Sequence, residues 1–499
     1  MPIACPALSS TLQSFLGGRG QRAEFLIGGN WVAPHNGASM ATVDPATGKE
    51  IGRIGCASAP DIDRAVAAAR AAFDSWRSTT PAKRARILWA VADLIETNID
   101  ELAELETLDQ GKPLFVGRWA EIPGAAGQFR FFAGQAMAIE GRTIESSIDY
   151  QSPGKQVSSW TVREPVGVVA AIVPWNSPLV LTAMKLAPAL AAGCTVILKP
   201  AEDTSLTALR LGELMLEAGV PSGVVNIISG PGAESGAALA NHPDVDKIAF
   251  TGSTATGRAI LDAAKVNFKR VTLELGGKSP VIILPDADLD LAIAGAANAI
   301  FFNAGQVCVA GSRLYVHRSI HDRVVEGVAE YARNLTVGHG LDPATQMGPL
   351  VSTKHATRVA TFLDDARAQG ATLLTGGVHD GAAFVTPAVV TGVRPDMAIV
   401  REEVFGPVVV AQSFDEVDDV VAAANDSDYG LAASIWTESL SSAHRLTRSL
   451  RAGTVWINCH AMYDASLPIG GVKQSGWGRD SGRLAMDNYL EWKTVCAVV

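Results

Sequence analysis

The sequence predicts an α/β fold in which two parallel sheets are wrapped by helices and a small β segment stands apart. Apolar runs alternate with amphipathic segments from residue 166 to 275, and they do so again from 280 to 457. Such alternation is typical of βαβ units, whose buried parallel strands form continuous apolar runs. At about 150 residues per domain, a chain of 499 residues has room for roughly three domains.

The elements are expected in the following order. Helical spacing of Ala, Leu and Ile predicts helices over 61–76 and 81–107, and a third over 113–139 that is interrupted near Pro123 and Gly124. In the first alternating region, strands are expected at 166–173, 194–199, 224–228, 247–250 and 270–275, with helices at 176–192, 203–217, 233–241 and 254–266. In the second, helices are expected near 286–301, 319–334, 352–369 and 415–424, with strands near 312–316, 384–390, 407–412, 432–435 and 453–457.

Two segments fall outside this alternation. Residues 141–160 are rich in Thr, Ser and Ile and are expected to form a two-stranded excursion. The tail 489–499 alternates in polarity and then becomes apolar. Because an apolar terminal strand is hard to leave in water, we expect the tail to add to a sheet, either of this chain or of another subunit.

The composition argues against several classes of partner. The net charge of −10 disfavours nucleic acid and anionic membranes, because phosphate groups are bound by basic surfaces. No apolar run approaches the roughly 20 residues of a membrane span, and residues 1–20 lack the basic and apolar regions of a secretory leader. The cysteines, at positions 5, 56, 194, 308, 459 and 496, include no C-x-x-C pair, so we expect a reducing, cytoplasmic location and no metal site.

Two short motifs point to nucleotide binding. The segment 250–257 (FTGSTATG) lies between a strand and a helix, so its backbone N–H groups could approach a pyrophosphate, or it could be a tight turn that binds nothing. Lys199 and Glu202 follow another strand, at the edge where parallel sheets bind nucleotides. Glu202 could accept hydrogen bonds from ribose hydroxyls and would repel a 2′-phosphate; an ordinary surface ion pair is the alternative.

Three further side chains suit catalysis. Asn176, which follows Trp175 at a helix start, carries an amide that could stabilise an oxyanion or could only cap the helix. Glu274 is followed by Leu275 and then by two glycines, and it could be a general base or a solvated loop residue. Cys308 has small and apolar neighbours and could be a nucleophile, if its pKa is depressed, or a buried filler.

In this order, the segments PWN, KPAE, FTGSTATG, ELGGKSP, GQVCVAGSR, EEVFGP and PIGGVKQSGWGRD closely resemble the hydrolytic NAD(P)-dependent branch of the aldehyde dehydrogenase superfamily. The resemblance covers essentially the whole chain. It implies a Rossmann-type cofactor domain, a catalytic α/β domain and a small β oligomerisation arm, in a homodimer or homotetramer. The implied boundaries are 1–140 and 160–275 for the NAD-binding domain, 276–473 for the catalytic domain, and 141–159 with 474–499 for the oligomerisation segment.

The resemblance also implies a mechanism for oxidising a small-molecule aldehyde. Cys308 attacks the aldehyde carbon as a thiolate, and the side chain of Asn176 and the backbone N–H of Cys308 hold the oxyanion. Hydride passes to the nicotinamide, and a water activated by Glu274 hydrolyses the resulting thioester. Lys185 is similar to a lysine proposed to relay protons with Glu274. Asp480 is one methylene shorter than the Glu that the family often has at its position.

Contacts with the cofactor are implied in the same way. Lys199 and Glu202 are expected at the adenosine ribose, where Glu202 favours NAD, with NADP as the alternative. The other expected contacts lie along the dinucleotide: Trp175, Gly252, Ser253, Thr254, Gly257, Leu275, Glu403 and Phe405.

The family's substrate tunnel matches positions that are mostly apolar, several of them small: Ala120, Gly124, Ser177, Met184, Val307, Val309, Tyr463 and Ile469. They include no Arg or Lys for a substrate carboxylate and no obvious aromatic cage for a quaternary ammonium. Such a tunnel suits an aromatic or hydrophobic aldehyde, and the segment 456–468 resembles phenylacetaldehyde dehydrogenases. Aliphatic, betaine and semialdehyde substrates stay open.

Two other functions are weighed against this one. A CoA-acylating semialdehyde dehydrogenase would lack the general base, whereas Glu274 is present. A non-catalytic protein could retain the fold, but the presence of Cys308, Glu274 and Asn176 argues against it.

Overall fold

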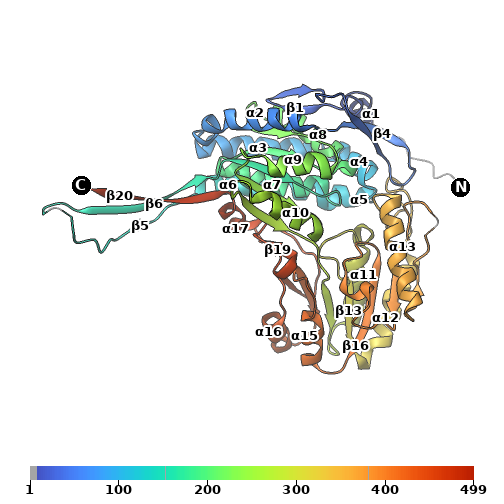
Figure 1. Ribbon diagram of the computed structural model, residues 1–499. Helices are drawn as coiled ribbons and strands as arrows, with labels where there is room; N and C mark the ends of the chain where they lie inside the picture. Colours follow the sequence, from blue (N-terminus) through green and yellow to red (C-terminus); the bar gives the residue numbers. More distant parts are fainter. Residues whose placement is uncertain (1–7, 152, 380) are drawn as a thin grey trace.

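Two open sheets form the body of the protein, and a third sheet projects from it (Figure 1). The figure shows a computed structural model, which describes residues 8–151, 153–379 and 381–499. Cys5 and the first seven residues of the segment 1–20 lie outside the described residues. Among the helices of the described residues, none is long and apolar enough to cross a membrane.

The first sheet has eight strands in the order β19-β11-β10-β7-β8-β9-β1-β2. Its parallel strands are β7 (Val168–Ile172), β8 (Thr195–Lys199), β9 (Val225–Ile227), β10 (Lys247–Thr251) and β11 (Arg270–Glu274), and its antiparallel edges are β1 (Phe25–Ile27), β2 (Asn30–Val32) and β19 (Gly476–Trp477). The chain builds β7, β8 and β9 in one direction and then places β10 on the other side of β7. Ligands of such sheets bind at the carboxyl ends of the strands that flank this reversal.

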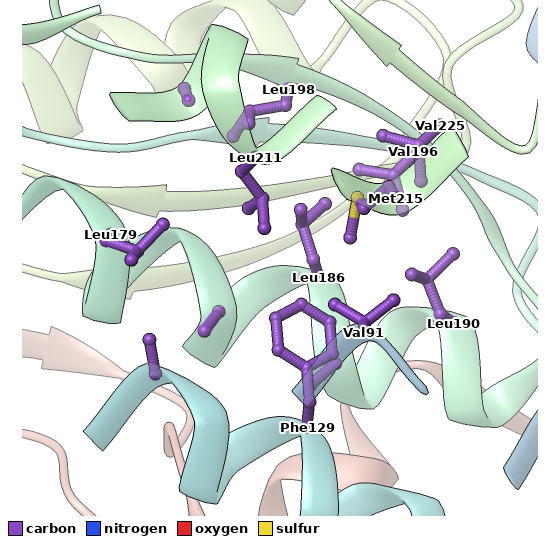
Figure 2. Close-up of a cluster of buried hydrophobic side chains, with 14 of the residues drawn as sticks. Val91, Phe129, Leu179, Leu186, Leu190, Val196, Leu198, Leu211, Met215 and Val225 are labelled. Atoms are coloured by element: carbon purple, nitrogen blue, oxygen red, sulfur yellow. The ribbon is translucent and has the colours of Figure 1, made fainter. Parts of the chain in front are cut away.

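Helices cover both faces of the first sheet. Val169 and Ala171 join the apolar cluster on one face, whereas Ala170 and Ile172 join the cluster on the other. The strand side chains therefore alternate between two cores, and the strands are apolar throughout. Figure 2 shows part of the first cluster, formed by α3, α6, α7 and α8 against β8 and β9: Val91, Phe129, Leu179, Leu186, Leu190, Val196, Leu198, Leu211, Met215 and Val225.

The helices of this part of the chain are α1 (Ser10–Gly17), α2 (Ala59–Arg77), α3 (Pro81–Thr97), α4 (Ile99–Gln110), α5 (Leu114–Val116), α6 (Ile122–Gln135), α7 (Pro178–Ala192), α8 (Leu206–Glu217), α9 (Ala237–Asn241) and α10 (Thr254–Ala264). Local sequence fixes their ends. Pro178 begins α7, where its missing N–H costs nothing, and Gly193 ends it in the left-handed conformation.

The second sheet has seven strands in the order β14-β15-β16-β13-β12-β17-β18, parallel except for β14. The strands are β12 (Pro280–Ile283), β13 (Arg313–His317), β14 (Thr372–Thr375), β15 (Ala388–Thr391), β16 (Val408–Phe414), β17 (Ala432–Trp436) and β18 (Thr454–Ile457). The helices around it are α11 (Leu289–Phe301), α12 (His321–Asn334), α13 (Thr353–Ala368), α14 (Ala398–Arg401), α15 (Val417–Asn425) and α16 (Leu440–Ser449). In Figure 1 this sheet lies below the first one.

The third sheet forms an arm (β5, Thr143–Ile144; β6, Val157–Pro165; β20, Leu490–Val498) that extends away from both other sheets (Figure 1). β20 follows α17 (Gly482–Asp487) and pairs with β6 along its whole length. The excursion and the added terminal strand are therefore both present, and this chain itself supplies the partner strand. Trp160, Trp492 and Val498 are exposed on the arm.

Two helical predictions need correction, and several elements were not predicted. The expected helix over 81–107 is two helices, because the chain turns at Asn98. The helix over 113–139 is not broken at Pro123, which lies in the first turn of α6; the irregularity is a π turn just before it, Gly117–Glu121. The sequence did not predict β1 to β4 (β3, Ser39–Val43; β4, Glu50–Gly55), β12, β14 or α16.

Candidate active site

The first sheet brings most of the predicted residues to one edge. Asn176 follows β7, Glu202 follows β8, Ser253 follows β10 and Glu274 ends β11. Since these strands are parallel and adjacent, their carboxyl ends lie side by side at the reversal in strand order. Residues that lie up to about a hundred positions apart in the sequence thus share one edge of the sheet.

Cys308 lies on a sharp turn that follows α11. Asn303 and Ala304 are held in the left-handed region at φ 49° and 53°, which costs energy for residues with a side chain. The side chain of Gln306 fastens this turn: its Nε2 donates to the Asn303 carbonyl (3.1 Å), and its Oε1 accepts from the backbone N–H of Val351 (2.9 Å). The backbone before Cys308 is therefore fixed by buried hydrogen bonds.

Asn176 is tied to the same turn. It is 5% exposed, and its Nδ2 donates to the Gln306 carbonyl at 2.9 Å. Asn303 Nδ2 donates in return to the Asn176 carbonyl at 3.0 Å. The second N–H of the Asn176 amide and the backbone N–H of Cys308 have no acceptor among the residues that the structure describes. Two free donors are thus held at the turn that carries Cys308.

Cys308 is a protonated thiol in this arrangement. Burial raises its pKa to about 12, and the nearby carboxylates of Glu403 and Glu274 add to the effect. The sequence left open whether this pKa is depressed; the surroundings of the thiol raise it. A thiol beside two acidic groups becomes nucleophilic only when its proton is removed or positive charge arrives.

Glu274 is 7% exposed, and neither of its carboxyl oxygens has a hydrogen bond of normal geometry within the described residues. Burial raises its pKa well above the ordinary value, and Asp480 adds to this, while Lys185, Arg479 and the Gly471 backbone N–H oppose it. A carboxyl group with a raised pKa and no partner is suited to accept and release a proton.

Lys185 and Asp480 form a buried ion pair next to Glu274. Lys185 Nζ lies 2.6 Å from Asp480 Oδ2, and the two side chains are 0% and 8% exposed. The shorter side chain of Asp480 therefore does reach Lys185. Its loop is held by a pair of backbone hydrogen bonds between Ile469 and Asp480.

Glu403 approaches the crevice from the second sheet. Its Oε1 accepts from the Gly277 backbone N–H at 2.9 Å. A Cβ at Gly276 would lie 2.2 Å from Glu403 Oε2, and one at Gly277 would lie 2.4 Å from the Cys308 carbonyl, so only glycine permits this close approach. Burial raises the pKa of Glu403 to about 7, while the Gly277 N–H and Lys278 act in the opposite direction.

Three rings gather beside Glu403. The Trp175 ring lies 5.3 Å from both the His355 and the Phe405 rings, in edge-to-face orientations. Phe405 has a positive φ of 59°, and the ring Nε2 of His355 is 2.7 Å from its carbonyl. His355 thus holds Phe405 in a strained conformation. The sequence did not predict this role of His355, because a single His on a helix does not indicate a functional site.

A second cluster of predicted residues lies at the end of β8. Lys199 is buried, donates from Nζ to the Pro200 carbonyl (3.0 Å), and stands 3.5 Å from Glu202 Oε2. Burial tends to raise the pKa of Glu202, but Lys199 and the Gly232 N–H, which donates to Oε1 at 3.1 Å, bring it below the ordinary value. Glu202 is therefore an ionised acceptor at neutral pH.

The nearby start of α10 leaves backbone donors open. Ser253 caps the helix by accepting from the Thr256 N–H at 3.2 Å. The first N–H groups of a helix have no intrahelical acceptor, so those that follow Ser253, beginning with Thr254, face solvent with a partial positive charge. Gly257, one turn on, allows Leu275 to pack against the helix, since a Cβ there would lie 2.8 Å from Leu275 Cδ2.

The predicted tunnel positions include one polar contact. Ser177 Oγ donates to Glu121 Oε1 at 2.9 Å, and Lys112 Nζ lies 3.3 Å from the same oxygen. Lys112 also contacts Glu106 Oε1 at 2.5 Å, and all three charged side chains are buried. The sequence did not predict this group of Lys112, Glu106 and Glu121. The three side chains meet only when the elements that carry them pack together.

The other tunnel positions lie on five segments. Ala120 ends the π turn with Glu121; a Cβ at Gly124 of α6 would contact Val180 of α7, at 3.4 Å from its Cγ2. Met184 lies on α7, and Val307 and Val309 flank Cys308. The last two positions are on the 457–469 loop: Tyr463, whose ring stands 6.0 Å from that of Trp456, and Ile469. The same loop is anchored by a 2.9 Å hydrogen bond between His460 Nε2 and the Val309 carbonyl.

A nucleotide-binding sheet that faces a second domain carrying a half-buried cysteine defines the class of dinucleotide-dependent oxidoreductases. The chain belongs to the aldehyde dehydrogenase family, whose family model matches residues 31–495. It is 47% identical over 478 residues to phenylacetaldehyde dehydrogenase from Pseudomonas fluorescens, with 95% of each chain covered. It is 46% identical over 477 residues to aldehyde dehydrogenase family 2 member B4, mitochondrial, from Arabidopsis thaliana, with 95% of this chain and 87% of that protein covered.

The fold is also similar to that of a solved structure, the NAD⁺ complex of aldehyde dehydrogenase from Bacillus cereus. The TM-score is 0.95, the sequences are 45% identical, and all of both chains is covered. The protein is an NAD-dependent aldehyde dehydrogenase, as the sequence predicted. Its own residues fit the dinucleotide. Glu202 is an ionised acceptor for ribose hydroxyls, the start of α10 offers free N–H groups for phosphate, and Glu403 Oε2 has no partner among the described residues.

Proposed function

We propose that this enzyme oxidises an aromatic or hydrophobic aldehyde, such as phenylacetaldehyde, to its carboxylic acid by covalent catalysis at Cys308. The observation that carries the proposal is the hydrogen bond from Asn176 Nδ2 to the Gln306 carbonyl, which fixes an amide with one free N–H to the turn that carries Cys308. When NAD is bound, it accepts the hydride that leaves the substrate carbon.

The first half of the reaction uses Cys308 and Asn176. The Cys308 thiol gives its proton to the Glu274 carboxylate, the sulfur forms a bond to the aldehyde carbon, and the carbonyl electron pair moves to oxygen; Glu274 releases that proton before the second half of the reaction. The free N–H of Asn176 and the backbone N–H of Cys308 donate to this oxyanion, and because both are fixed in advance they need no reorganisation. When the carbonyl forms again and the hydride departs, the acyl group remains on sulfur as a thioester.

The second half uses Glu274. A water attacks the thioester carbon and gives its proton to the Glu274 carboxylate, the carbon–sulfur bond breaks, and the carboxylic acid leaves. The Lys185–Asp480 ion pair beside Glu274 offers a route for that proton away from the reaction chamber. The presence of Glu274 favours water over a thiol as the final acceptor.

Two facts support the aromatic substrate. The predicted tunnel positions are largely apolar, and one 47% identical relative is named for phenylacetaldehyde. At the tunnel, Tyr463 and Met462 are large side chains that are 49% and 63% exposed, so they offer apolar surface to a ring. The Glu121 carboxylate is balanced by Lys112, which leaves no free cation there to select a substrate carboxylate.

The wider organisation is proposed on the same basis. The NAD-binding domain comprises 1–140 and 160–275, the catalytic domain 276–473, and the oligomerisation segment 141–159 and 474–499. The exposed Trp160 and Trp492 on the arm favour a homodimer or homotetramer. The five cysteines of the described residues are all free, in keeping with a cytoplasmic enzyme.

The test is NADH formation, followed by absorbance, with phenylacetaldehyde, betaine aldehyde and succinic semialdehyde. We expect the highest kcat/KM for phenylacetaldehyde, and a higher value for either other aldehyde would refute the substrate assignment. Cys308→Ala should abolish turnover and retain NAD binding. Cys459→Ala is the matched control, because Cys459 belongs to the same apolar cluster as Cys308 and has no proposed role. Turnover by Cys308→Ala would contradict the mechanism.

A further inference from the structure

Lys247 is a buried lysine that the proposed reaction does not use. It begins β10 and is 1% exposed. Its Nζ donates to Thr272 Oγ1 at 3.0 Å and lies 5.2 Å from the centre of the Tyr489 ring. Within the described residues no carboxylate comes within ion-pair distance of it, although burying an ammonium group without a counter-ion is costly.

The strand register directs Lys247 toward Glu274. In the β10–β11 pair, Ala249 is opposite Thr272 and Thr251 is opposite Glu274. Alternate residues of a strand share a face, and paired residues of neighbouring strands share it too, so Lys247, Thr272 and Glu274 point to the same side of the sheet. Successive residues on a face are about 6.6 Å apart along a strand. An ammonium bonded to Thr272 is therefore one such step from Glu274.

The same side of the sheet carries the ion pair of Lys185 and Asp480, from α7 and the loop after β19. These two groups face Lys247, as do Arg270 of β11, the Cys194 thiol and the Tyr489 ring. Burial raises the pKa of Cys194 to about 12, so it brings no negative charge at neutral pH. Asp480 is thus the anion that this group of cations shares.

Burial lowers the pKa of Lys247 to about 7, and the charge of Lys185 adds to the effect. Lys247 therefore gains its positive charge as the pH falls through neutrality, in the range where Glu274, whose pKa is raised, would otherwise take up a proton.

We propose that Lys247 is a positioning residue whose positive charge keeps Glu274 ionised in mildly acidic solution, and so sets the lowest pH at which the thioester is hydrolysed. Lys247 acts through the electrostatic field of the Lys185–Asp480 pair and touches neither substrate nor cofactor. The inference rests on the proposed role of Glu274 as general base.

The direction of the effect follows from the charges. A positive charge near a carboxyl group favours its ionised form, so its removal raises the pKa of Glu274. The base is then ionised only at higher pH, and the acid limb of the hydrolysis rate moves upward. At pH values where Lys247 is already neutral, its removal changes little.

The test isolates hydrolysis from acylation. Enzyme in excess over phenylacetaldehyde is mixed with NAD, samples are quenched with acid at intervals, and the acyl group on Cys308 is followed by mass spectrometry between pH 5.5 and 9.5. Lys247→Met removes the charge and keeps the length of the side chain. Lys247→Arg retains a charge. Lys269→Met is the matched control, because Lys269 is also buried but donates to the Ala240 and His242 carbonyls, away from Glu274.

For Lys247→Met we expect the midpoint of the acid limb to rise by about one pH unit, so that thioester decay at pH 6 slows about tenfold and decay at pH 9.5 stays within about twofold. Lys247→Arg and Lys269→Met should keep the wild-type midpoint. An unchanged midpoint in Lys247→Met, or an equal shift in Lys269→Met, would overturn the inference.

If Lys247→Met does not fold, Thr272→Val takes its place. This isosteric change removes the acceptor of the Lys247 ammonium, disfavours its charge, and should shift the midpoint in the same direction; no shift would overturn the inference. A burst of NADH without a thioester in the wild-type enzyme would instead refute the proposed mechanism. The role of Glu274 as general base, on which the inference about Lys247 rests, would then fail as well.

Discussion

Replacement of Asn176 by alanine tests the arrangement that defines the site. One N–H of the Asn176 amide is used by the Gln306 carbonyl, and the other is free to meet the substrate oxyanion. Removing one such donor costs about 3–4 kcal/mol of transition-state stabilisation, or about 10²–10³ in kcat. The fold should tolerate the change, because the Gln306 carbonyl keeps Asn303 Nδ2 at 3.4 Å and a lost hydrogen bond costs about 1 kcal/mol.

The assay is steady-state NADH formation under saturating NAD and aldehyde, with thermal unfolding measured in parallel. Asn226→Ala is the control: Asn226 is also fully buried, and it donates to the Gly223 carbonyl and accepts from Gly28 far from Cys308. We expect Asn176→Ala to lose kcat and Asn226→Ala to lose only stability. A kcat for Asn176→Ala within about threefold of wild type, or a defect confined to KM, would refute the oxyanion role, because the predicted loss is in the transition state.

Three further outcomes are expected. Glu202→Ser should raise kcat/KM with NADP relative to NAD, because it removes an ionised carboxylate from the ribose site; an unchanged cofactor ratio would contradict that placement. Inactivation by iodoacetamide should become about tenfold faster per pH unit from 7 to 10, since burial raises the pKa of Cys308 to about 12, and a plateau in that range would show a more acidic thiol. Lys112→Met should lower the free energy of unfolding by about 3–5 kcal/mol at neutral pH, because it strands the buried Glu106 and Glu121. That loss should shrink in acid, since burial raises the pKa of Glu106 and a protonated carboxyl needs no counter-ion; urea midpoints at pH 5 and 8 would measure it.

The sequence predicted the central strands of the first sheet well and its edges poorly. β7 and β8 are buried on both faces, so each is an uninterrupted apolar run that stands out from its neighbours. β2, at the edge of the first sheet, is short, antiparallel and half exposed, as is β3, which pairs with β4 in a separate two-stranded sheet, and such strands have no comparable pattern. The π turn before α6 was not predicted; it ends at Glu121, whose contacts with Lys112 and Ser177 appear only in the folded structure.

The site residues were predicted as a set because their motifs end strands that lie side by side. Their chemistry was not predictable in the same way. The raised pKa of Cys308 comes from burial and from Glu403 and Glu274, which reach it from other elements. Likewise, that Asp480 reaches Lys185 depends on the backbone bridge to Ile469, and nothing in the local sequence reports that distance.

These contacts show why neither proposed domain holds the nucleophile alone. Cys308 stands on a turn of the second domain, yet that turn is bonded to Asn176 of the first. Within the second domain, Glu403 is bonded to Gly277, which stands only three residues after Glu274, the last residue of β11 in the first domain. A shift between the two sheets would therefore move the sulfur, the oxyanion donors and the cofactor ligand at once. Since oriented donors lose most of their effect when displaced by about 1 Å, the hydrogen bonds that join the two domains should matter to kcat as much as the residues that touch the aldehyde.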